Sequence, residues 1–138
     1  DRRQRQMCIR DRAGGIPIWV GGSSDAALQR AARYSDGWHG NLSPMDTFKE
    51  RLARLRSFGP GRELVISARA NVADERRESP GRAATMYTLG GSPQDILDDI
   101  RRYEDAGMSY LAVGFWDGDL AKQADRMARF AEQVMSKG

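Results

Sequence analysis

The sequence has few of the residues that build metal sites and disulfide frameworks. Its 138 residues contain one cysteine, Cys8, and one histidine, His39. A single cysteine cannot form an internal disulfide, and a single histidine without cysteine partners does not make a zinc cluster. We therefore expect no metal site, and the low cysteine content is typical of a protein from the reducing cytoplasm.

Long apolar runs are also missing. No stretch approaches the roughly 18 apolar residues that a membrane-spanning helix needs, and residues 1–12 lack the apolar middle of a secretory signal. We expect no membrane contact and a cytoplasmic location. The remaining composition, with 40% apolar residues, can support the core of one domain.

The excess of basic residues is confined to one end of the chain. Residues 1–12, DRRQRQMCIRDR, hold the whole formal net charge of +3, and residues 13–138 carry equal numbers of basic and acidic side chains. A basic arm that binds nucleic acid is one interpretation. The tract also resembles translated sequencing-adapter sequence, so we expect it to be non-native or disordered. Residues 13–138 then form the domain, and no nucleic-acid partner is expected.

From Ala13 onward, short strand-like runs alternate with amphipathic helical patterns. Four strands are predicted, each followed by a helix, and a serine marks the start of the first three helices. The 73–91 segment is predicted to be a long loop. The strands are 16–20, a short one around Trp38 and His39, 64–72 and 110–115; the helices begin near Ser24, Ser43, Ser92 and Leu120.

Four βα units in series predict an α/β fold with a parallel sheet. They make half of a (β/α)₈ barrel, which needs about 250 residues when complete. A small open, doubly wound sheet fits the same pattern. The alternation alone does not separate these two architectures.

The turn Gly21-Gly22-Ser23-Ser24 is the strongest candidate for a binding site. Glycines at the carboxyl end of a strand allow a ligand to approach the backbone, and the following helix start offers free N–H groups to a phosphate. A tight turn closed by a serine cap uses the same residues and binds nothing. Both interpretations fit the residues equally well.

Three further residues are weaker candidates for a substrate or ring pocket. His39 lies near the end of a strand and is the one candidate for proton transfer, although a lone histidine is more often structural. Trp38 offers a flat ring, and Arg69 offers a cation for an anionic group. The plain alternatives are packing for Trp38 and an ion pair for Arg69. The acidic and basic residues of 98–105 are expected to form a solvated helix face.

Several motifs together resemble one family. Pro17-Ile18-Trp19-Val20-Gly21-Gly22, then Ser35-Asp36-Gly37-Trp38-His39, and later Gly91-Ser92-Pro93 and 105–111 are similar in order and spacing to the carboxyl half of luciferase-like monooxygenases. The run DGWH followed by Leu-Ser-Pro looks most like the deazaflavin-dependent members, which use coenzyme F-420, with FMN as the competing cofactor.

The resemblance implies a barrel in which a reduced cofactor lies at the carboxyl ends of the strands. It implies that Gly21, Gly22, Ser23 and Ser24 hold the cofactor phosphate and that Trp38 and His39 lie near the ring or a small-molecule substrate. It also implies that the first four strands are missing, so we expect this chain alone to be inactive and the intact enzyme to be a homodimer. A different class of hypothesis is a non-enzymatic half barrel that dimerises through its exposed strand edges.

Overall fold

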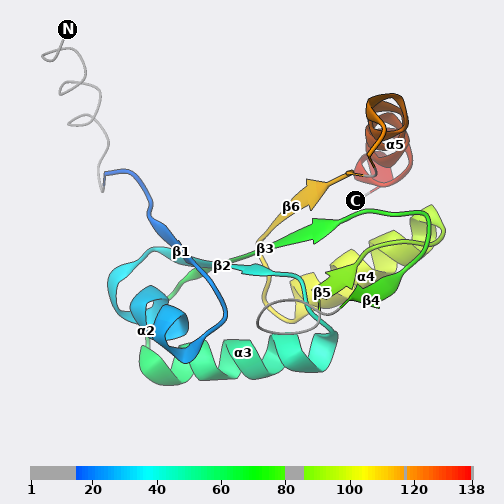
Figure 1. Ribbon diagram of the computed structural model, residues 1–138. Helices are drawn as coiled ribbons and strands as arrows, with labels where there is room; N and C mark the ends of the chain where they lie inside the picture. Colours follow the sequence, from blue (N-terminus) through cyan, green and yellow to red (C-terminus); the bar gives the residue numbers. More distant parts are fainter. Residues whose placement is uncertain (1–14, 80–85, 117, 138) are drawn as a thin grey trace, which may run out of the picture.

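The computed structural model describes residues 15–79, 86–116 and 118–137, so the expected non-native tract lies outside the described residues. Its centre is a four-stranded parallel sheet in the order β1-β2-β3-β6 (Figure 1). The strands are β1 (Trp19–Gly21), β2 (Gly37–Asn41), β3 (Val65–Asn71) and β6 (Tyr110–Gly114). The helices are α2 (Asp25–Tyr34), α3 (Met45–Phe58), α4 (Pro93–Asp105) and α5 (Leu120–Gln133), with a final 3₁₀ turn η1 (Met135–Lys137). The four predicted βα units are therefore present.

The core lies between the sheet and its helices. Trp38 and Phe48 are fully buried there, and the Phe48 ring makes an edge contact with Tyr103 at 5.2 Å between centroids. Along β3, Ile66, Ala68 and Ala70 face this core. Figure 1 shows α2 and α3 side by side beneath the sheet, where they close its outer face.

The helix starts were partly predictable. Ser24 caps α2 by accepting from the Ala27 N–H at 3.3 Å, and Ser92 forms a reciprocal capping box with Asp95 at the start of α4. The expected Ser43 cap is wrong, because Pro44 takes the cap position and makes no side-chain bond. Ser43 is buried instead, and its carbonyl accepts from the Tyr103 hydroxyl at 2.7 Å.

The first strand is shorter and later than the sequence predicts. β1 begins at Trp19, where it meets Gly37, the first residue of β2. Ile16 and Ile18 stay exposed, because the pairing of β1 with β2 begins only at Trp19. The side chain of Asp36 holds the segment through the Ile18 N–H at 2.8 Å.

The segment predicted as a long loop contains an antiparallel pair, β4 (Arg77–Ser79) and β5 (Met86–Thr88). β5 runs across the carboxyl ends of the main strands. The Tyr87 N–H donates to the Leu42 carbonyl at 2.9 Å, and the Leu89 N–H donates to the Asn71 carbonyl at 2.9 Å. The prediction failed here because these bonds join residues that are distant in sequence.

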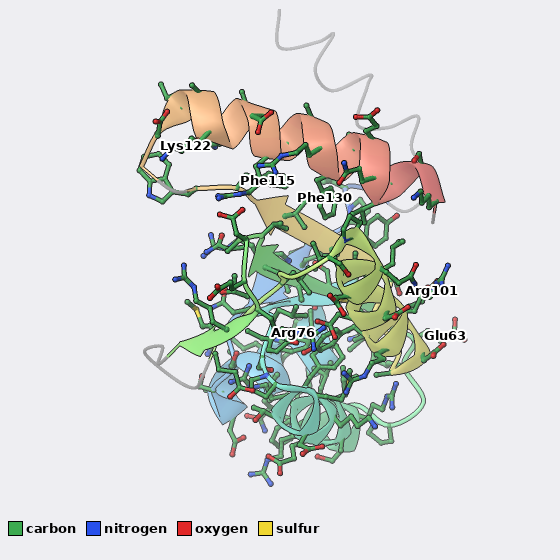
Figure 2. The ribbon with its side chains drawn as sticks, turned by 90° about the vertical axis from the view of Figure 1, so that its right-hand side faces the viewer. Glu63, Arg76, Arg101, Phe115, Lys122 and Phe130 are labelled. Carbon is green, nitrogen blue, oxygen red and sulfur yellow. The ribbon has the colours of Figure 1, made fainter. Side chains whose placement is uncertain are left out.

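α5 lies away from α2 and α3 (Figure 1), and it lines a cavity of about 290 Å³ together with α4. Phe130 packs against Phe115 at 5.3 Å, and Figure 2 shows the two side chains beneath the helix. Along this segment Val134 is buried, whereas Leu120 and Met127 are exposed. Among the described residues no strand pairs with the free edges of β1 and β6. Dimerisation through these edges stays a prediction.

None of the helices in the described ranges combines the length and the apolar character that crossing a membrane requires.

Candidate functional site

The inner face of the sheet, opposite the helices, is organised in layers. Residues paired across parallel strands point to the same side, so the register places Trp19, Gly37 and Val65 in one layer and Gly21, His39, Ser67 and Tyr110 in the next. The layers toward the carboxyl ends hold Asn41, Arg69 and Ala112, then Asn71 and Gly114. The face is therefore aromatic near the strand starts and polar near the strand ends.

Two aromatic rings form the floor of this face. Trp19 and Tyr110 lie 5.3 Å apart between centroids, although β2 and β3 separate their strands. The Trp19 ring lies over Gly37, where an added Cβ would come within 2.9 Å of its Cδ1. Both rings remain accessible, Trp19 at 38% and Tyr110 at 59%. The last strand, β6, is therefore accessible on this face.

His39 lies in the same layer as Tyr110 and one layer above Trp19. Its Nδ1 is 2.5 Å from the hydroxyl of Ser67, which is buried in β3. The ring is half-buried, and its Nε2 has no hydrogen-bond partner in the described part of the chain. His39 therefore lies on the inner face, with its ring held by the hydroxyl of Ser67.

Trp38 occupies the opposite face. Its side chain is completely buried against the helices, and its indole N–H donates to the Gly22 carbonyl at 2.6 Å. Alternation along β2 points neighbouring side chains to opposite sides, so Trp38 and His39 cannot share one pocket. The expected pocket role of Trp38 is corrected to packing and to support of the glycine turn from behind.

Arg69 is on the inner face, as its alternation in β3 predicted. It is exposed and lines a small cavity of about 30 Å³ with Asn41 and Asn71. β5 closes this cavity through Met86, Tyr87 and Thr88. Among the described residues Arg69 has no ion-pair partner, so its charge is available to an anionic group.

The turn after β1 leaves backbone N–H groups accessible to a ligand. Gly22 has a φ of 110°, and an added Cβ would lie 3.0 Å from the Ala27 Cβ. Ser24 is committed to the helix cap, whereas the Ser23 hydroxyl and the N–H groups of Asp25 and Ala26 make no hydrogen bond with the described residues. Two free N–H groups at a helix start suit an anion.

Charge at this turn is balanced by a neighbouring helix. Arg54 of α3 donates two hydrogen bonds to the Asp25 carboxylate, at 3.1 and 2.5 Å. These bonds lower the pKa of Asp25. Because the ion pair offsets the Asp25 charge, the carboxylate repels an incoming phosphate less than an unpaired one would.

Asp99 is a buried acidic residue that the sequence did not reveal. It lies beside the mouth, by which we mean the carboxyl ends of β2 and β3 around Arg69 together with β5. Asp99 is 2% exposed, in contrast to the solvated face predicted for its helix. It accepts from the Tyr87 hydroxyl at 2.8 Å and pairs with Arg76 at 3.1 Å and Arg102 at 3.5 Å. Figure 2 shows Arg76 between the β4–β5 pair and α4. Asp99 therefore links α4 to the β4–β5 pair. Through its hydrogen bond it also holds Tyr87, which lines the cavity beside Arg69.

The same contacts change the acidity of the tyrosines. Burial and the hydrogen bond to Asp99 together raise the pKa of Tyr87 to about 12. Burial also raises the pKa of Tyr103. Within residues 15–79, 86–116 and 118–137, no group of three or more His, Cys, Asp or Glu is arranged to hold a metal ion.

Four parallel strands, each followed along the chain by a helix, define a βα-repeat protein. In such folds ligands bind at the carboxyl ends of the strands. Comparison with known sequences identifies the family. The model of the luciferase-like monooxygenase family matches residues 2–88. The chain belongs to this family, as its motifs predicted.

Relatives with similar sequences are themselves uncharacterized. Uncharacterized proteins of Mycobacterium bovis and Mycobacterium tuberculosis are 35% identical over 135 aligned positions, which cover 88% of this chain and 39% of the relative. The chain thus spans well under half the length of these curated relatives.

Two solved structures share the fold. A coenzyme F-420-dependent tetrahydromethanopterin reductase from Methanopyrus kandleri has a TM-score of 0.65 at 13% identity, over 88% of this chain and 51% of that one. An F-420-dependent secondary alcohol dehydrogenase has a TM-score of 0.63 at 11% identity, over 88% and 48%. The half-barrel architecture is confirmed, and the open doubly wound alternative is set aside. The family and its structural neighbours are oxidoreductases.

Proposed function

We propose that this chain is the carboxyl-terminal half of an oxidoreductase that uses coenzyme F-420 and that its Gly21–Ser24 turn holds the cofactor phosphate. The observation that carries the proposal is the open turn: Gly22 at positive φ, and free N–H groups on Asp25 and Ala26 at the start of α2. When bound, the cofactor supplies the hydride chemistry, and the protein supplies orientation and electrostatics.

The turn and the inner face are continuous. Gly21 is paired with His39 in the second layer, and the Gly22 N–H donates to the His39 carbonyl at 3.3 Å. An added Cβ at Gly21 would meet only that carbonyl, at 3.6 Å. A cofactor with its phosphate at the turn therefore has room to extend across Gly21 toward the polar layers.

The charge of the turn favours F-420 over FMN. The phosphate of F-420 is a diester, which carries less negative charge than the monoester of FMN at neutral pH. Neither lysine nor arginine occurs in the turn, and the carboxylate of Asp25 lies at its end. Backbone N–H groups and a single serine suit the less charged phosphate better. FMN is the alternative cofactor.

The test is a fluorescence titration of the complete protein that contains this segment, with F-420 and with FMN. We expect tighter binding of F-420. Gly22→Asp places a side chain against Ala27 and a carboxylate in the turn, so we expect F-420 affinity to fall by more than about tenfold.

Gly61→Asp is the matched control. Gly61 also has positive φ, at 78°, and an added Cβ would meet nothing within 4 Å. It lies before β3, at the opposite end of the sheet from the turn. This variant should bind F-420 like the wild type. A folded Gly22→Asp protein with unchanged F-420 affinity would rule out the phosphate site.

A further inference from the structure

The hydrogen bond between His39 and Ser67 defines which nitrogen of His39 carries the proton. A serine hydroxyl can donate or accept, and a neutral imidazole has one donor and one acceptor nitrogen. If Nδ1–H donated to Ser67, the serine hydrogen would need another acceptor. Ser67 is 2% exposed and has no other side-chain hydrogen bond among the described residues.

A buried hydroxyl hydrogen without an acceptor is costly, because the group gives up its hydrogen bond to water and gains none in return. Donation from Ser67 to Nδ1 avoids this cost, because the hydroxyl hydrogen then has its partner. The proton of the neutral ring is consequently on Nε2, which has no partner in the described ranges.

The surroundings of His39 leave space for a ligand on the inner face. Gly21 contributes no side chain to the layer of His39. Tyr110 lies in that same layer, and Trp19 lies in the layer below. Arg69 lies in the layer above, toward the carboxyl ends of the strands. A flat ligand over Gly21 would therefore have the Trp19 ring beneath it, the Tyr110 ring in its own layer and polar groups toward the strand ends.

We propose that Ser67 is a positioning residue that holds His39 as the Nε2–H tautomer, so that Nε2–H donates a hydrogen bond to a carbonyl or alkoxide oxygen of a ligand over Gly21. The tautomer part stands on the geometry of this chain alone. The ligand part rests on the proposed function.

His39 is the only histidine of the chain, so nitrogen-15 labelling of histidine reports on this ring without overlap. The spectrum of the 138-residue chain is recorded in alkaline buffer, where histidine is neutral. We expect Nδ1 to resonate as an unprotonated acceptor and Nε2 as a protonated donor. Ser67→Ala should shift both resonances toward the average of a tautomer mixture, and Ser67→Thr, which keeps the hydroxyl, should restore them.

The matched control is Ser57→Ala, which removes an exposed hydroxyl of α3 that donates to the Arg54 carbonyl. It should leave the His39 resonances unchanged. A wild-type ring in the Nδ1–H form, or a Ser67→Ala spectrum identical to wild type, would overturn the positioning role. If a substitution unfolds the chain, the complete protein gives the same readout, with His39→Gln identifying the His39 signals.

The ligand part is tested in the complete protein with F-420 as the probe. We expect F-420 to shift the His39 Nε2 resonance and His39→Leu to weaken F-420 binding about tenfold, the usual effect of one hydrogen bond. Binding of F-420 with no change at Nε2 would contradict the donor role. Absence of F-420 binding would instead contradict the proposed function while the tautomer result stood.

Discussion

The two faces of the sheet differ in what covers them. On the outer face, Trp38, Phe48 and Ile66 are buried beneath helices in a closed core. On the inner face, Trp19 and Tyr110 remain accessible, and polar residues follow them toward the strand ends. Both faces are made by the same strands, because side chains alternate along each strand. In this chain the outer face carries the closed core, and the inner face carries the accessible aromatic and polar side chains.

The difference also separates neighbouring residues by role. Trp38 and His39 are adjacent in sequence, yet Trp38 supports the glycine turn from the core side and His39 lies with Ser67 on the open side. Conversely, residues far apart in sequence meet on one face, as Trp19 and Tyr110 do. Proximity in a motif is therefore a poor guide to a shared pocket in this chain.

The largest contrast is expected between two aromatic truncations. Phe48→Ala should lower the free energy of unfolding by about 3–5 kcal/mol, because it opens a cavity in the closed core. Trp19→Ala should cost about 1–2 kcal/mol, because the ring is already partly accessible and mainly loses its contact with Tyr110. Urea unfolding measures both, with Phe48→Leu as the control that keeps most of the volume. Equal losses in the free energy of unfolding for Phe48→Ala and Trp19→Ala would contradict the distinction between the two faces of the sheet.

A smaller effect is expected from pH at the mouth. The pKa of Tyr87 is about 12 in the folded chain, above the usual value of 10.0. The folded state thus retains a proton that the unfolded state loses, so Tyr87 contributes stability that is complete below pH 10 and is lost as the pH rises toward 12. Thermal unfolding between these values should show a steeper decline for wild type than for Tyr87→Phe. Parallel curves would contradict the buried bond to Asp99.

Local chemistry was predictable from sequence where the signal was short in range. Ser24 and Ser92 cap the helices that follow them, and the alternation in β3 correctly separated Ile66, Ala68 and Ala70 from Arg69. The family resemblance then selected the barrel from two architectures that the pattern left open.

Features that depend on distant partners were missed. Asp99 is buried against Arg76, which directly precedes β4, and Tyr87, which lies in β5. The segment of β5 is bound to the strand ends through Tyr87 and Leu89, which donate to the Leu42 and Asn71 carbonyls. Ser67 gave no signal as a site residue, since a serine on an alternating strand is unremarkable until His39 lies beside it.

Hydrogen exchange in the complete protein tests most directly whether the turn after β1 holds the phosphate. The N–H groups of Asp25 and Ala26 have no partner among the described residues, so they should exchange rapidly without cofactor and slowly with saturating F-420. Amides of α3 around Leu52 should not change. Unchanged rapid exchange at Asp25 and Ala26 in the F-420 complex would contradict the account.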